Sequence, residues 1–531
     1  MVLHLRRIDD RVVLAAATFV SSWVILVSTA PGIPIVWDEG EYLFRASRII
    51  EWFRLGPDAF SRQAIQTQWL FMTYAEGHPA GFALPIALGQ WLASPLVDPL
   101  TAARLGPITL FSLACAAVAV SLKEHYGAAA AVAAPITLLT FPRIFSEAHF
   151  ATQDGQLTAW WLLLWSLQST ISRGTGITVM LGVVLGLTTA TKFTGWLAWA
   201  PTLVSEAVRS RTAVRPLVII VPVALFAFYL VNPNLWYDPF GALKDHFYRN
   251  LNRVHSLDIP TRFLGGVYSL EKPLPWHNTL TWLLLVTPPP TLVLGAIGLF
   301  RCVTKPTTGS LTLVAHWLTL MVVRALPGAP PHDGIRLFLP AFGLWCVLAG
   351  IGAQTVLGTL SSIRVASWRN AFRIALVAAL LTSAVDVIRY YPQMLSHYSP
   401  LAGGLAGAVR MGMEPAYWWD ALDNDVLKWV NERTGPRESV AFSPVANLGL
   451  LRDWRRLHPR AVDARTDVFK WYVLQNRPGM LTRIDRILMR REQPVFVKYA
   501  GRRRARERVP ADMKVPLILV FSFEQYQRAR R

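Results

Sequence analysis

Residues 12–42 read VVLAAATFVSSWVILVSTAPGIPIVWDEGEY, and this stretch decides the class of fold. Residues 12–30 are almost wholly apolar, and about twenty such residues are needed for a helix to cross roughly 30 Å of hydrocarbon. Basic residues precede the run, but its length and the lack of a small-x-small cleavage site predict an uncleaved anchor rather than a signal peptide. The chain is therefore expected to enter a membrane and to emerge directly into the acidic segment Trp37–Tyr42.

The rest of the chain repeats this pattern of apolar runs. Of its 531 residues, 53% are hydrophobic and only 16% are charged, and the charges gather between the runs. Because backbone groups in lipid must be paired internally, such runs are expected to be helices. The sequence predicts a polytopic α-helical membrane protein of about eleven spans: 12–30, 103–122, 127–142, 155–170, 175–190, 193–208, 215–231, 279–300, 311–324, 335–357 and 371–389.

The sidedness of the spans follows from the basic loops, which collect on the cytoplasmic face. Segment 79–97 is apolar but contains prolines and a glutamine, and if it crossed, every basic loop after it would move outside. We therefore predict that 79–97 lies in the outer interface. The N-terminus is then cytoplasmic, in a membrane that the resemblance given below suggests is a bacterial inner membrane.

Two long loops, 36–102 and 232–278, are predicted on the outer side. Long loops that gather titratable residues on one face are where function is usually found. Residues 1–390 are thus interpreted as the multi-span domain. Hydropathy falls from about residue 391, so 391–531 is predicted to be a soluble extracytoplasmic α/β domain with strands near 439–445, 495–499 and 517–523.

The net charge of +20 is concentrated toward the C-terminal end, where 391–531 holds 25 Lys and Arg against 14 Asp and Glu. In a membrane protein such a surface favours anionic membrane lipids or a phosphorylated substrate rather than nucleic acid, with a merely solvated surface as the alternative. The histidines of 232–278 are too widely spaced for a local metal motif. No metal site is predicted, although a divalent metal stays possible.

The segment Trp37-Asp38-Glu39-Gly40-Glu41-Tyr42 carries the strongest chemical signal. Transfer of an anomeric carbon to a hydroxyl or amine needs a carboxylate base, together with cations for the departing phosphate. The alternative is a plain helix start, where Asp and Glu favour the positive end of the helix dipole. Other ionisable residues at the same predicted depth favour a shared site. These are Glu76 and His78 at the end of the first loop, Arg104 at the start of the next span, and Asp154 at the end of the short second outer loop, 143–154.

In the order and sidedness of these motifs, residues 10 to 360 resemble GT-C glycosyltransferases, in the group of protein O-mannosyltransferases and lipid A aminoarabinose transferases. The resemblance is carried by Asp38-Glu39 after the first span, by His78-Pro79-Ala80, and by Arg104 and Asp154. It continues with Lys192 in Thr191–Gly195 and with Arg336 in Arg336–Pro340. Two positions depart from the family pattern: Ala80 stands for a second proline, and Leu337 where the family often has Tyr.

The resemblance implies an integral-membrane glycosyltransferase that uses a polyprenyl-phosphate-linked sugar as donor. Asp38 would be the base that deprotonates the acceptor, and Glu39 would orient it or hold the acceptor. Lys192 and Arg336 would bind the donor phosphate. Arg104 is expected to pair with a loop carboxylate, and Asp154 to help position the sugar or the first loop. The acceptor stays open between a protein, a lipid and a glycan.

Two other classes of protein remain as alternatives. A transporter or flippase of a lipid or sugar also has many spans with scattered charge, but carriers usually show related halves, and none is evident here. A GT-C-like assembly subunit without activity is the second alternative. Replacing Asp38 separates the three, because only an enzyme would lose turnover while it still binds donor lipid.

Overall fold

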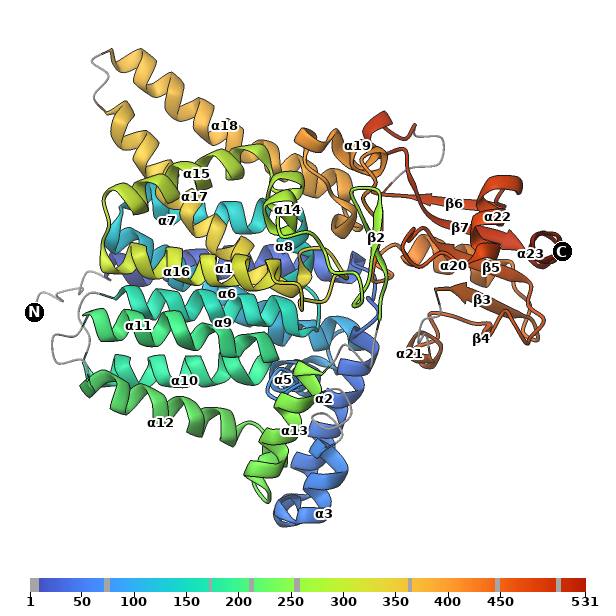
Figure 1. Ribbon diagram of the computed structural model, residues 1–531, viewed down its shortest axis with the longest axis horizontal. Helices are drawn as coiled ribbons and strands as arrows, with labels where there is room; N and C mark the ends of the chain where they lie inside the picture. Colours follow the sequence, from blue (N-terminus) through green and yellow to red (C-terminus); the bar gives the residue numbers. More distant parts are fainter. Residues whose placement is uncertain are drawn as a thin grey trace, which may run out of the picture.

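The structure is a computed structural model that describes residues 9–70, 77–170, 174–209, 214–252, 258–361, 365–444, 449–502 and 508–531. It is a helical bundle with a small sheet domain at one end (Figure 1). The helices up to residue 230 are α1 (Asp10–Thr29), α2 (Glu39–Arg54), α3 (Arg62–Ile65), α5 (Ala83–Ala93), α6 (Pro99–His125), α7 (Ala128–Thr140), α8 (Pro142–Glu147), α9 (Gln153–Ser169), α10 (Thr175–Thr191), α11 (Trp199–Arg209) and α12 (Val214–Leu230).

The remaining helices complete the bundle and cover the sheet. They are α13 (Pro239–Leu251), α14 (Asn278–Val286), α15 (Pro289–Thr304), α16 (Thr308–Ala325), α17 (Leu339–Leu360), α18 (Ala366–Tyr390), α19 (Gly404–Arg410), α20 (Asn424–Glu432), α21 (Gly449–Asp453), α22 (Arg483–Arg491) and α23 (Phe523–Arg530). The strands are β1 (Thr261–Phe263), β2 (Gly266–Tyr268), β3 (Ser439–Ser443), β4 (Arg460–Val462), β5 (Trp471–Gln475), β6 (Phe496–Tyr499) and β7 (Pro516–Ser522).

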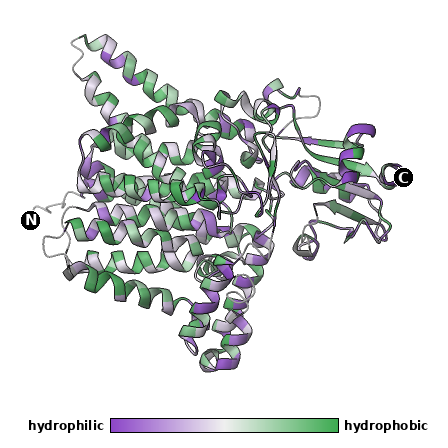
Figure 2. Ribbon diagram, viewed as in Figure 1, coloured by the Kyte–Doolittle hydropathy of each residue, from purple (hydrophilic) through white to green (hydrophobic). Residues whose placement is uncertain are grey.

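Helix α17 is the central helix of the bundle. It packs against α7, α9, α15 and α16, which cover a helix that is apolar on all sides. Two glycines allow α15 and α17 to approach closely, since a Cβ on Gly298 or Gly352 would lie 1.9 Å from a carbonyl oxygen of the other helix. Figure 2 shows hydrophobic residues along the bundle helices and more hydrophilic ones around the sheet domain.

Four described helical segments are long and apolar enough to cross a membrane: Asp10–Gly32, Pro99–His125, Arg336–Leu360 and Ala366–Tyr390. Several shorter apolar helices accompany them, so an integral membrane protein is supported while the count of eleven spans is not confirmed. The segment 279–300, expected to be one continuous helix, is divided into α14 and α15. The two helices are separated by Thr287 and Pro288, because the prolines at 288–290 lack the N–H that a continuous helix needs.

The segment predicted to lie at the interface forms α5, which has only 11 residues. At 1.5 Å per residue it rises about 16 Å, roughly half of what a crossing helix needs. Its length therefore agrees with a helix that does not cross.

The C-terminal sheet has the strand order β4-β3-β5-β7-β6, with β3 parallel to β4 and β5, and β7 antiparallel to β5 and β6. The sequence predicted β3, β6 and β7 but missed β4 and β5. Before the sheet begins, the chain after α18 packs back on the bundle, where Met394–Ser396 contacts α8 and Pro400–Ala402 contacts α14. Helix α2, helix α13 and the sheet domain all lie at the end of the bundle away from the N-terminus (Figure 1).

Candidate functional site: a buried charge network at the end of the bundle beside the sheet domain

The acidic segment after α1 does begin a helix, but not all of its carboxylates serve that helix. Asp38 precedes the first residue of α2, and its side chain makes no capping hydrogen bond. Glu41 lies in the first turn and pairs with Arg45 at 3.2 Å, in the i,i+4 arrangement of an ordinary helix surface. The role expected of a carboxylate at a helix start therefore applies to Glu41. The Asp38 carboxylate instead contacts Arg336.

Arg336 brings three carboxylates together. Its guanidinium lies 3.1 Å from Asp38, 3.1 Å from Asp154 and 3.0 Å from Asp333. The Asp154 and Asp333 side chains are each only 4% exposed, whereas that of Asp38 is 25% exposed. Arg336 lies just before α17, so the start of α2, the start of α9 and the 326–334 loop converge on one cation. Among these three carboxylates, Asp38 is the one that solvent or a substrate reaches.

Lys192 extends the network toward the bundle. It follows α10 in an extended backbone conformation, and its ammonium forms a buried ion pair with Asp154. Asp154 therefore bridges Lys192 and Arg336, the two cations that the sequence assigned to a phosphate. Residues 154, 192 and 336 are far apart in the sequence, and only the packing of α9, α10 and α17 brings them together.

Glu39 and Arg104 form a separate, fully buried pair. The shortest contact between them is 2.7 Å, and both side chains are 0% exposed. Glu39 also accepts hydrogen bonds from the backbone N–H groups of Val36 and Ala151, while Arg104 donates to the carbonyl of Ile33. The expected pairing of Arg104 with a loop carboxylate is confirmed. In this position Glu39 holds the loop before Asp38 in place. Its side chain is fully buried and cannot contact an acceptor.

Several site residues were missed by the sequence reasoning because they lie in other segments. Arg477, after β5, donates a hydrogen bond to Asp333 at 3.0 Å and approaches Glu414 at 3.5 Å. Burial alone would raise the pKa of Asp333, but the Arg336 and Arg477 guanidiniums outweigh it and lower that pKa to about 2. Asp333 is thus a fixed negative charge that ties Arg336 to the C-terminal domain.

Trp418 completes the support of Arg336. Its backbone carbonyl accepts a hydrogen bond from Trp37 N–H at 2.9 Å, so the C-terminal segment holds the residue next to Asp38. Trp418 and Trp419 both adopt positive φ, 62° and 64°, a region that bulky side chains rarely occupy. Their sequence, Tyr417-Trp418-Trp419, had no signal beyond interfacial aromatic residues.

Glu147 is a further buried carboxyl near the network. It ends α8, and neither of its carboxylate oxygens has a hydrogen-bond partner among the described residues. Burial raises the pKa of Glu147 well above its ordinary range; Asp154 adds to this effect, and Arg336 and Lys192 oppose it. Burial therefore favours the neutral form of the Glu147 carboxyl beside a charged network.

His78 lies on the other side of Lys192. It is buried and lines a cavity of about 570 Å³ together with Lys192 and Arg324. Arg324, at the end of α16, donates a hydrogen bond to the carbonyl of Pro331 at 3.3 Å. Most of the remaining cavity wall is apolar, from residues such as Phe193, Trp196, Leu197, Leu320, Val323 and Phe338.

Glu76, which the sequence placed with His78, lies outside the described residues. Within the ranges that the structure describes, no three His, Cys, Asp or Glu side chains are grouped to hold a metal ion. The site residues that the structure brings together are therefore Asp38, Asp154, Lys192 and Arg336, with Glu39 and Arg104 beneath the loop and His78 at the adjoining cavity.

No protein-family model and no curated protein matches the chain. Among solved structures, it is similar to ArnT of Cupriavidus metallidurans in the apo state (TM-score 0.49) and bound to undecaprenyl phosphate (0.47), both at 15% identity over 96% of this chain and 97% of that one. It is also similar to the oligosaccharyltransferase AglB of Archaeoglobus fulgidus in complex with an inhibitory peptide and a dolichol-phosphate, with a TM-score of 0.47 and 12% identity over 86% of this chain and 69% of that one. ArnT, a lipid A aminoarabinose transferase, and AglB are GT-C enzymes, the superfamily that the sequence motifs resemble.

Proposed function

We propose that the protein is an integral-membrane glycosyltransferase that moves a sugar from a polyprenyl-phosphate donor to an acceptor on the extracytoplasmic side. Asp38 is the general base in this proposal. The observation that carries it is the unequal exposure of the carboxylates around Arg336. Asp38, at 25%, is the accessible one, while Asp154 and Asp333, at 4% each, are enclosed.

The reaction follows from this geometry. An acceptor hydroxyl or amine gives its proton to the Asp38 carboxylate as its oxygen or nitrogen bonds to the anomeric carbon of the sugar. The bond between that carbon and the phosphate oxygen breaks, and polyprenyl phosphate leaves as an anion. Cations near the leaving oxygen stabilise the charge that develops on it, and they do so best in a site that excludes water.

The cavity beside Lys192 suits the donor. A lipid phosphate combines an anionic head with a long apolar chain, and the wall here combines Lys192 and Arg324 with an apolar remainder. Arg336 can also contribute to phosphate binding, because Arg336 and Lys192 both pair with Asp154. When a phosphate oxygen competes for Arg336, the exposed partner Asp38 is the one most easily released, and it is then available as a base.

The test compares Asp38→Asn with Glu41→Gln. Both remove one negative charge from the start of α2, but Glu41 pairs only with Arg45 among the contacts described and lies outside the network. Purified protein would be supplied with polyprenyl-phosphate mannose, glucose and arabinose-type donors, and release of polyprenyl phosphate would be followed. We expect Asp38→Asn to lose at least 100-fold in turnover while it still binds donor, and Glu41→Gln to keep turnover within a few-fold.

Equal turnover in the two variants would contradict the role of Asp38. Turnover with a nucleotide sugar alone would contradict the lipid-linked donor. A carrier would move substrate without releasing polyprenyl phosphate, and an inactive assembly subunit would show neither activity.

A further inference from the structure

A second cavity lies on the opposite side of the same two chain segments. It has a volume of about 530 Å³, within the usual range for ligand pockets. Gly81 and Thr191 line it, whereas His78 and Lys192 line the cavity assigned above to the donor. The two cavities are therefore separated by segments 78–81 and 191–192, and the Lys192–Asp154 pair lies at the boundary.

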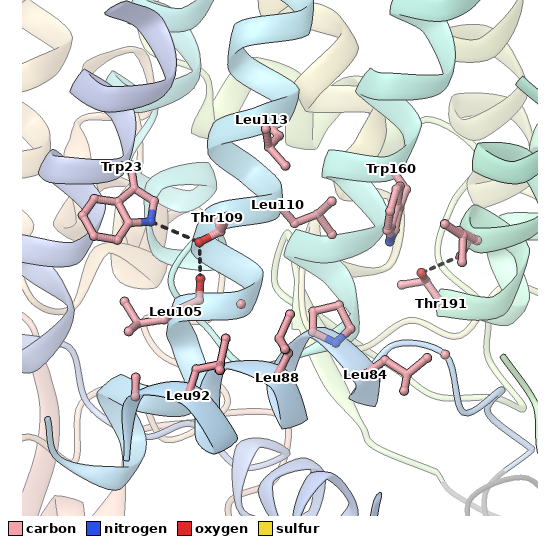
Figure 3. A pocket seen from close by; sticks show the side chains of 16 residues that line it. Trp23, Leu84, Leu88, Leu92, Leu105, Thr109, Leu110, Leu113, Trp160 and Thr191 are labelled. Atoms are coloured by element: carbon pink, nitrogen blue, oxygen red, sulfur yellow. Dashed lines mark hydrogen bonds between the residues drawn. The ribbon is translucent and has the colours of Figure 1, made fainter. Parts of the chain in front are cut away.

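Helix α5 closes this second cavity on one side. Figure 3 shows α5 running across α6 and α9, with Leu110 of α6 and Trp160 of α9 facing each other over it. Helices α5 and α6 approach so closely that their backbones are in contact. A Cβ on Gly106 would lie only 1.8 Å from the Pro85 carbonyl oxygen, so this position needs a glycine. The cavity is thus built into the packing of the bundle rather than left by a loose loop.

The lining has no charged residue, and its hydroxyl groups are already bonded. Trp23 Nε1 donates to Thr109 Oγ1 at 3.1 Å, Thr109 donates to the Leu105 carbonyl, and Thr191 donates to the Leu187 carbonyl. With those hydroxyl groups satisfied, the wall offers a ligand mainly dispersion and hydrophobic contact. A phosphate head group would find no cation in this lining. A hydrocarbon chain, in contrast, would contact apolar side chains along its length.

The surroundings supply such a chain. Leu88, Leu92 and Leu113 of the lining are 52%, 65% and 48% exposed. The first two lie on α5, which the sequence places at the membrane interface, and Leu113 lies on α6, a candidate span. Trp160 lies six residues along α9 from Asp154, which is about 9 Å at 1.5 Å per residue. A chain held in this cavity would therefore carry its head group close to the charge network.

We infer that this cavity, lined by α1, α5, α6, α9 and α10, binds the hydrocarbon chain of a lipid acceptor, opposite the donor lipid. The inference rests on the proposed function, and it selects a lipid among the acceptor classes that the sequence left open. Two lipids then approach one charge network from two sides: the donor enters where Lys192 and Arg324 can meet its phosphate, and the acceptor enters where no charge selects against a neutral chain.

The test uses Leu113→Trp, which fills the cavity from an exposed position, and Val24→Trp as its control. Val24 is an exposed residue of α1 that does not line the cavity. Full-length protein in nanodiscs would be labelled with dodecyl glucoside carrying a diazirine at the chain end, and labelled peptides would be mapped. We expect label on α5, α6 or α9 in the wild type and in Val24→Trp, and at least a ten-fold loss in Leu113→Trp. Excess polyprenyl phosphate should not displace the dodecyl glucoside probe from the wild type.

Kinetics give the second readout, with methyl to dodecyl glucosides as surrogate acceptors. Each methylene that enters the cavity should improve kcat/KM by about four-fold, the factor that corresponds to ~0.8 kcal/mol. This dependence on chain length should flatten in Leu113→Trp, while transfer to methyl glucoside and hydrolysis of the donor by water stay unchanged.

Three results would overturn the inference. Label that polyprenyl phosphate displaces would assign the cavity to the donor. Label that persists in Leu113→Trp would show only general contact with lipid. Equal dependence on chain length in the wild type and Leu113→Trp would favour an acceptor bound elsewhere, such as a protein. If the wild type binds the probe in the cavity but never releases polyprenyl phosphate, the proposed function fails while the lipid site stands.

Discussion

The guanidinium carbon of Arg336 lies 4.0 Å from the centroid of the Trp418 ring. Arg336 belongs to the membrane bundle and pairs with Asp38, whereas Trp418 follows the last long helix. The geometry of the candidate site therefore depends on a segment outside the bundle, and the C-terminal part of the chain forms one wall of the site.

Replacing Trp418 should weaken the site by releasing Arg336. A cation over a desolvated aromatic face is stabilised by up to about 2 kcal/mol, and truncating a buried Trp to Ala costs roughly 3–5 kcal/mol in addition. We expect Trp418→Ala to lower both the melting temperature and kcat, and Trp418→Phe to retain most of both. Donor turnover and thermal unfolding in detergent measure these effects. Trp419→Phe is the control, since Trp419 is equally buried but contacts Phe442 instead.

The Arg477–Asp333 contact should behave as a coupled pair. Removing one partner of a buried ion pair leaves an unpaired charge and costs about 3–5 kcal/mol. We expect Arg477→Met and Asp333→Asn each to lower the unfolding temperature clearly, and the double variant to be less affected than the sum of the two. Additive losses in this double-mutant cycle would show that the contact contributes no coupling.

Substitutions of Glu39 and Asp38 should have different effects, because Glu39 has a structural role and Asp38 a chemical one. Glu39→Gln weakens the buried pair with Arg104, so we expect it to lower stability and, through the displaced loop, activity as well. Asp38→Asn should remove activity with little change in the melting temperature, because Asp38 is partly exposed. If Glu39→Gln were fully stable but inactive, Glu39 would take part in the reaction itself.

Asp420 should make the stability depend on pH. Burial raises the pKa of Asp420 to about 8 in the folded protein, and nearby Arg143 only partly offsets this. In the unfolded chain an Asp titrates near 3.9. The stabilising contribution of the protonated group is therefore complete below about pH 4 and is lost as pH rises toward 8, by at most about 1.4 kcal/mol per pH unit.

The Asp420→Asn variant keeps the neutral form at every pH. Its melting temperature should exceed that of the wild type increasingly from pH 5 to pH 8, and the two should converge near pH 4. Parallel curves for the two proteins over this range would show that Asp420 titrates normally.

The sequence alone was enough to predict a helical membrane protein whose candidate site residues gather at one end. Apolar runs near twenty residues allow few other structures, because lipid offers no partner for unpaired backbone groups. The same reasoning drew attention to Asp38, Glu39, Arg104 and Asp154, since ionisable residues at the ends of apolar runs are costly unless they are paired or used. Lys192 and Arg336 were added only by the resemblance to a known superfamily. It also expected Arg104 to have a carboxylate partner, which is Glu39.

Only the tertiary structure decided which of these residues meet and what surrounds them. The Asp38–Arg336 and Asp154–Lys192 contacts join positions that are 298 and 38 residues apart, and no local pattern encodes such pairings. Asp333, Trp418 and Arg477 lie outside the motifs from which the site was predicted. The break between α14 and α15 depended on the three prolines at 288–290, which outweighed an otherwise continuous apolar run. Composition thus set the environment of the chain, while the roles of single charges followed from packing, because the energy of a charge depends on its partners and burial.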